Sequence, residues 1–91
     1  MLTGTVTEWK WVNPHVWIFL SVDDGNGVKT LWEIEGRPPG VLARAGWSKS
    51  TFKPGDRITV DFSPARDGSP SGLTTRVTLA DGTVLSQASP Q

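Results

Sequence analysis

The sequence contains no cysteine and only one histidine, and its charges balance. Without cysteine the chain cannot form disulfide bonds, thiolate nucleophiles or zinc–thiolate sites. No apolar run approaches the roughly 18 residues that a membrane-spanning helix needs, so we expect no membrane insertion. Nine basic and nine acidic side chains give a formal net charge of zero, which supplies no electrostatic attraction to nucleic acid. We therefore expect no nucleic-acid partner.

The length of 91 residues suits one core and leaves no room for a second domain. We predict one domain over residues 1–85 and a flexible C-terminal tail over residues 86–91. Five tryptophans are the unusual feature of the composition. Each can bury a large area, which compensates for the short chain.

Segments rich in β-branched and aromatic residues alternate with glycine, proline, asparagine and aspartate. The predicted strands cover residues 2–12, 15–23, 28–35, 57–62 and 73–79, with a short sixth strand over residues 83–85. Residues 41–45 resemble a short helix closed by Gly46, and residues 63–72 read as a loop. This order predicts an all-β, five- to six-stranded OB-like barrel with one short helix between strands three and four. An SH3-like barrel or a small sandwich is the alternative.

The pairing of the first two strands decides which side chains face the core. A two-residue turn at Asn13-Pro14 places Val12 opposite His15. The core face of this hairpin then carries Trp9, Trp11, Val16, Ile18, Leu20 and Val22, and the outer face carries Glu8, Lys10, His15, Trp17 and Phe19. A longer turn shifts the pairing by one residue and moves Trp9 and Trp11 to the His15 side.

The outer face is the candidate ligand-binding surface. Its predicted binding residues are Glu8, Lys10, Asn13, His15, Trp17 and Phe19. Exposed aromatic rings on an OB-type barrel form a platform on which planar groups stack. The structural alternative is that Trp17 and Phe19 pack under the helix or under the loop over residues 63–72.

His15 is the candidate metal ligand, because imidazole binds Cu(II) well. Its alternative role is to stabilise the turn through hydrogen bonds. The acidic loop from Asp23 to Gly27 lacks the spacing of a calcium loop and reads as a solvated hairpin. Glu33 and Glu35 share one face of their strand, but nothing in the sequence places a substrate between them. With no nucleophile motif or phosphate loop, we predict that the protein is not an enzyme.

Several segments together resemble a family of small exported bacterial proteins known only as a domain of unknown function. The most specific segment is Trp11-Val12-Asn13-Pro14-His15-Val16-Trp17-Ile18. The other matching segments are Gly4-Thr5-Val6, Trp32 to Gly36, Gly46-Trp47, Lys53-Pro54-Gly55-Asp56 and Leu79-Ala80-Asp81-Gly82. The resemblance implies export to the periplasm behind a cleaved signal peptide, and it implies no assigned activity.

Three functional hypotheses follow. The first is a non-enzymatic periplasmic binding or accessory module that engages a small ligand or a partner protein through the aromatic face. The second is a metal-handling protein, for copper, with His15 as a ligand. The third is a structural domain that forms homo-oligomers through unpaired strand edges.

Overall fold

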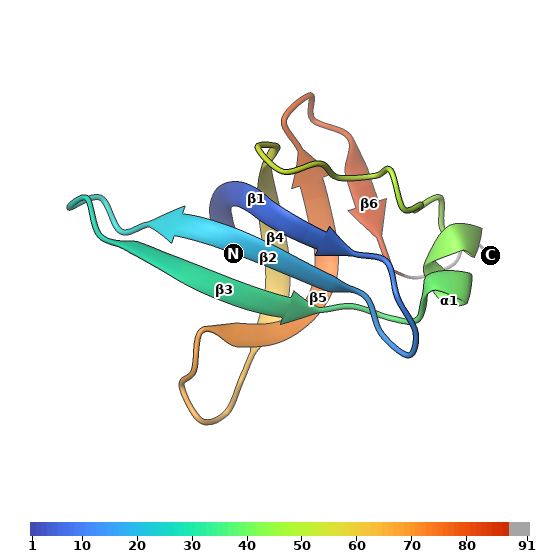
Figure 1. Ribbon diagram of the computed structural model, residues 1–91, viewed down its shortest axis with the longest axis horizontal. Coiled ribbons are helices and arrows are strands. Elements are labelled where there is room, and N and C mark those ends of the chain that lie inside the picture. Colours follow the sequence, from blue (N-terminus) through green and yellow to red (C-terminus); the bar gives the residue numbers. More distant parts are fainter. Residues whose placement is uncertain (88–91) are drawn as a thin grey trace.

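The strands and the helix follow the predicted order, and the computed structural model describes residues 1–87 (Figure 1). The strands are β1 (Leu2–Lys10), β2 (Trp17–Asp23), β3 (Lys29–Glu35), β4 (Arg57–Pro64), β5 (Ser71–Leu79) and β6 (Val84–Ser86). The helix α1 (Pro39–Arg44) lies between β3 and β4. No helix within residues 1–87 is both long enough and apolar enough to cross a membrane.

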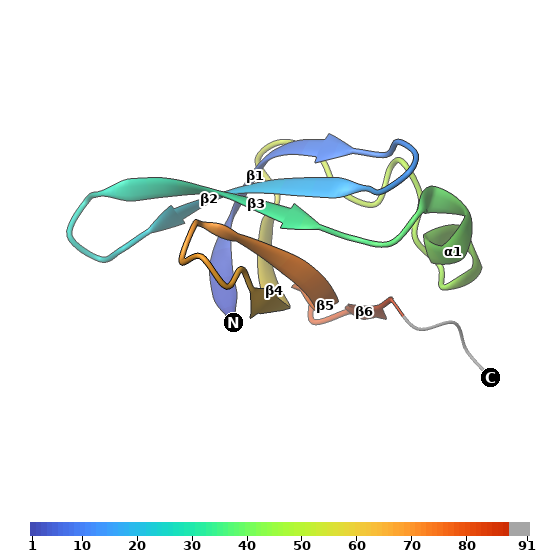
Figure 2. The same cartoon turned by 90° about the horizontal axis from the view of Figure 1, so that it is seen from below.

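The strands close into a barrel. They are ordered β3-β2-β1-β4-β5-β6, and a parallel pairing of β3 with β5 joins the two sides of the five-stranded part. Figure 2 shows β1, β2 and β3 as one layer that crosses β4 and β5, with α1 at one end. The predicted all-β, OB-like barrel with a helix between the third and fourth strands is confirmed.

The core draws on all five barrel strands, α1 and the segments that flank it. Its members are at most 3% exposed: Val6, Val16, Ile18, Leu20, Ile34, Leu42, Trp47, Phe52, Ile58, Val60 and Val77. Trp47 and Phe52 come from the irregular chain between α1 and β4. The indole N–H of Trp47 donates to the carbonyl of Ser86 at 2.9 Å, which ties this segment to β6.

The register of the first hairpin is as predicted over its central residues. Lys10 pairs with Trp17, Trp9 with Ile18, and Glu8 with Phe19. Trp9 and Trp11 are partly buried against the core, as the two-residue turn predicts. A β-bulge that was not predicted lies between Val6 and Glu8.

The ladder of this hairpin is shorter than predicted. β1 ends at Lys10 and β2 begins at Trp17, so Val12 and His15 lie beyond the paired residues of the two strands. On the other side of β2, Val16 bonds to the chain beyond β3. Its N–H donates to the Arg37 carbonyl at 3.4 Å, and its carbonyl accepts from the Gly36 N–H at 2.9 Å.

The loop predicted over residues 63–72 is shorter in the structure, because both flanking strands extend into it. β4 continues to Pro64 and β5 begins at Ser71, with Pro64 opposite Gly72. The pairing requires a very close backbone approach, because a Cβ on Gly72 would lie 2.4 Å from the Ser63 carbonyl oxygen. Glycine at this position therefore lets the two strands extend.

The ends of two other elements also differ from the prediction. α1 begins at Pro39, two residues earlier than expected, since proline is well suited to the first turn of a helix. The ordered chain continues beyond residue 85: Ser86 belongs to β6 and Gln87 is buried. The rest of the predicted tail, residues 88–91, lies outside the described residues.

Candidate functional site

The outer face of β1, β2 and β3 brings together most of the predicted site residues. Strand pairing aligns Glu8, Phe19 and Glu33 in one row across the three strands. The next row aligns Lys10, Trp17 and Glu35. These side chains point outward because their neighbours in sequence, among them Ile18 and Ile34, fill the core.

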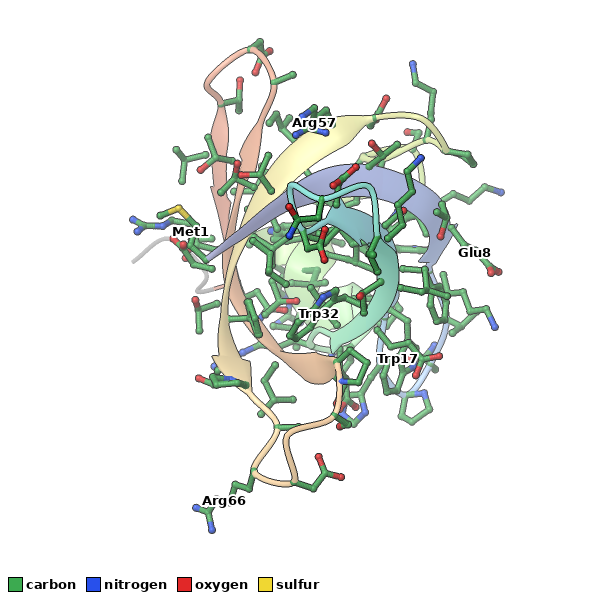
Figure 3. All side chains as sticks on the ribbon, turned by 90° about the vertical axis from the view of Figure 1, so that its left-hand side faces the viewer. Met1, Glu8, Trp17, Trp32, Arg57 and Arg66 are labelled. Carbon is green, nitrogen blue, oxygen red and sulfur yellow. The ribbon has the colours of Figure 1, made fainter. Side chains whose placement is uncertain are left out.

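Figure 3 looks along the barrel and shows side chains in its interior and side chains on its outer surface. Trp32 lies within the ring of strands, where its ring meets the Phe62 ring at 5.4 Å between centroids. Trp17 and Glu8 project from the outside of the barrel (Figure 3). Two tryptophans on adjacent strands thus have different surroundings. Trp32 of β3 lies in the interior of the barrel, and Trp17 of β2 lies at its surface.

A shallow hollow lies on this outer face. Its volume is about 210 Å³, and it is lined by Lys10, Trp17, Phe19 and Glu33. We call it the aromatic hollow. Trp17 and Phe19 are partly exposed and belong neither to the core nor to the side chains packed against it. Their surroundings do not match the alternative in which both rings pack under the helix or the loop over residues 63–72.

The charges around the aromatic hollow are mixed. The Lys10 ammonium lies 5.3 Å from the centroid of the Phe19 ring, a cation–π distance. The same ammonium is 4.0 Å from the Glu8 carboxylate, an exposed contact of little energetic value. Glu33 is exposed, and its carboxylate has no ion pair or hydrogen bond within residues 1–87. A ligand in the aromatic hollow therefore meets a cation at one side and a free carboxylate at the other.

His15 lies apart from the aromatic hollow and forms a pair with Glu35. The distance from His15 Nδ1 to Glu35 Oε2 is 2.7 Å. Because Nδ1 carries the hydrogen toward the carboxylate, Nε2 is the nitrogen left for another partner. The sequence predicted that Glu33 and Glu35 share one face of their strand. The contact between Glu35 and His15 could not be inferred from that spacing. Asn13 is exposed in the turn and does not line the aromatic hollow.

The metal hypothesis gains no cluster of ligands from the fold. Among residues 1–87 no group of three or more histidine, aspartate or glutamate side chains is arranged to hold a metal ion. In the acidic loop, the Asp23 carboxylate accepts from the Gly25 N–H and the Asp24 carboxylate from the Asn26 N–H, each at 2.8 Å. These carboxylates stabilise the hairpin turn itself.

Comparison with known protein families gives a match over residues 1–76, from β1 into β5. The chain belongs to the family of unknown function DUF6152. The matched range includes all the residues of the aromatic hollow as well as His15 and Glu35. The predicted membership of a family without an assigned function is confirmed. Neither the curated proteins nor the solved structures gave a match to the chain.

Proposed function

We propose that this member of DUF6152 is a non-enzymatic binding module that stacks one ring of a small, uncharged ligand on Trp17. The observation that carries the proposal is the aromatic hollow, in which two partly exposed rings lie outside the core. The hollow is on the face of strands two and three, which OB-type barrels use for oligonucleotides and oligosaccharides. The resemblance to exported bacterial proteins supports a periplasmic location.

The size and charge of the aromatic hollow narrow the ligand class. About 210 Å³ is below the usual range of drug-sized pockets, roughly 300–1,000 Å³, so the hollow fits one ring of a ligand. Lys10 and Glu33 flank the rings with opposite charges, which offer a hydrogen-bond donor and an acceptor without favouring a ligand charge. The chain also has no net charge to attract a phosphate backbone. Free nucleosides and short neutral oligosaccharides fit this description.

The test is an NMR titration of the labelled protein with adenosine, uridine and a neutral trisaccharide, following the indole N–H signal of Trp17 and the amide signals of Phe19 and Glu33, which the Trp17→Ala variant keeps. We expect a saturable shift with at least one of these probes. In Trp17→Ala the affinity should fall roughly fivefold to 150-fold, since stacking on an aromatic side chain contributes about 1–3 kcal/mol per base.

Leu31→Ala is the matched control. Leu31 is an apolar residue of β3 that is 51% exposed and does not line the aromatic hollow. Its replacement should leave the affinity unchanged. If none of the probes gives a saturable shift at Trp17, or if both variants weaken binding equally, stacking in the aromatic hollow is ruled out.

A further inference from the structure

A second and larger cavity lies where the chain leaving β3 meets β5 and the residue that follows β6. Its volume is about 410 Å³, within the usual range for small-molecule sites. We call it the Arg37 cavity. It is also lined by His15, Leu73, Thr74 and Gln87, and it shares no lining residue with the aromatic hollow.

Long-range contacts fix the walls of the Arg37 cavity. Gln87 Oε1 accepts from the Arg37 N–H at 2.8 Å, and Gln87 Nε2 donates to the Thr74 carbonyl. Gly36 makes this approach possible, since a Cβ there would lie 2.8 Å from Gln87 Oε1. The cavity wall is therefore built from three separate parts of the chain that are held together by one buried side chain.

The Arg37 cavity offers a cation without a partner. The Arg37 guanidinium forms no ion pair within residues 1–87. Glu35 supplies the one carboxylate in the cavity lining, and His15 Nδ1 already contacts it at 2.7 Å. The guanidinium is therefore left to pair with a carboxylate that enters the cavity.

The same cavity offers an apolar surface. Leu73 is 57% exposed although it lies in the middle of the sheet, paired with Glu35 on one side and Ser63 on the other. An exposed leucine at such a position would be covered by the apolar part of a ligand that fills the cavity.

We propose that the Arg37 cavity binds a small carboxylate with an apolar body. The carboxylate lies against the Arg37 guanidinium, whose planar fork matches two carboxylate oxygens. The apolar body of the ligand covers Leu73. This site is separate from the stacking site, so either proposal can fail without the other.

Benzoate is the probe, and the measurement is an amide NMR titration of the protein with sodium benzoate at constant ionic strength. We expect saturable shifts at the amides of Gly36, Arg37, Thr74 and Thr75. Benzyl alcohol has the same ring without the charge, and it should bind at least about tenfold more weakly, because charge-assisted hydrogen bonds are the stronger ones. Sodium chloride at the same concentration should not reproduce the shifts.

Two substitutions test the assigned contacts. Arg37→Gln should weaken benzoate binding roughly tenfold to a hundredfold, the usual range for losing hydrogen bonds to a charged group. Arg66→Gln is the matched control, since Arg66 projects into solvent from the loop between β4 and β5 (Figure 3). Leu73→Ala removes the apolar surface that the ring of benzoate covers and should weaken binding by severalfold.

The outcomes separate this proposal from the stacking proposal. Phe19→Ala alters the aromatic hollow but not the Arg37 cavity, so benzoate affinity should be unchanged in that variant. The carboxylate site is overturned if benzyl alcohol binds as tightly as benzoate. It is equally overturned if chloride gives the same shifts, or if Arg37→Gln binds benzoate like the unaltered chain.

Discussion

At the scale of single residues, Gln87 has the most consequential side chain outside the core. It is 8% exposed, and it satisfies the Arg37 N–H and the Thr74 carbonyl at once. Gln87→Ala removes both partners and leaves two backbone groups unpaired at a poorly solvated position. We expect the free energy of unfolding to fall by about 1–3 kcal/mol, measured by urea denaturation followed by tryptophan fluorescence.

Arg66→Ala is the control for this measurement, because Arg66 is exposed and forms no ion pair within residues 1–87. Its unfolding midpoint should match that of the unaltered chain. An equal midpoint for Gln87→Ala would mean that the Gln87 side chain contributes nothing to stability, and the bridge to Arg37 and Thr74 would have no structural role.

The importance of Gln87 could not be predicted from the sequence. It follows the last short strand in a segment of small and polar residues, a composition typical of a frayed end. Its burial depends on Gly36 and Thr74, which are brought to it only when the barrel closes. Local composition carries no information about contacts of that kind.

At the scale of elements, the first hairpin shows what periodicity can and cannot predict. The two-residue turn gave the correct pairing of Trp9 with Ile18, and alternation then gave the correct outer face. The bulge was missed, although its signal was present in the spacing. Val6 and Trp9 both pack toward the core, and residues three apart cannot share a face of a regular strand, which has a period of two.

The open edge of β3 leads to a prediction about hydrogen exchange. β5 pairs with β3 only at Glu33 to Glu35, and the Glu33 N–H donates to the Pro70 carbonyl at 3.1 Å. By alternation, the N–H groups of Leu31 and Lys29 point to the same side, where no described strand pairs with them. We expect these two amides to exchange rapidly and the Ile34 amide, on the β2 side in the core, to exchange slowly.

The measurement is amide exchange by NMR at a low and a high protein concentration. The rates at Leu31 and Lys29 should be the same at both concentrations if β3 keeps a free edge. Protection that appears only at the high concentration would instead support the hypothesis of assembly through strand edges.

At the scale of the whole molecule, the fold was more predictable than the sites. The barrel follows from the order of strands, breakers and one short helix, all of which are local features of the sequence. Three of the four residues that line the aromatic hollow were predicted, because Lys10, Trp17 and Phe19 follow from the first hairpin. The fourth, Glu33, requires the pairing of β3 with β2. The Arg37 cavity depends on the closure of β3 against β5, a contact between distant segments.

The single core also predicts how the molecule unfolds. Leu42 is the buried residue of α1, fully enclosed in a cluster that includes residues of every barrel strand. Leu42→Ala should lower the free energy of unfolding by about 2–5 kcal/mol, the range for removing a buried leucine side chain. Because α1 has no core of its own, circular dichroism and tryptophan fluorescence should report one shared transition, shifted equally in both signals. If the two signals separate in the variant, α1 is an attachment that unfolds by itself, and the barrel strands form the core without it.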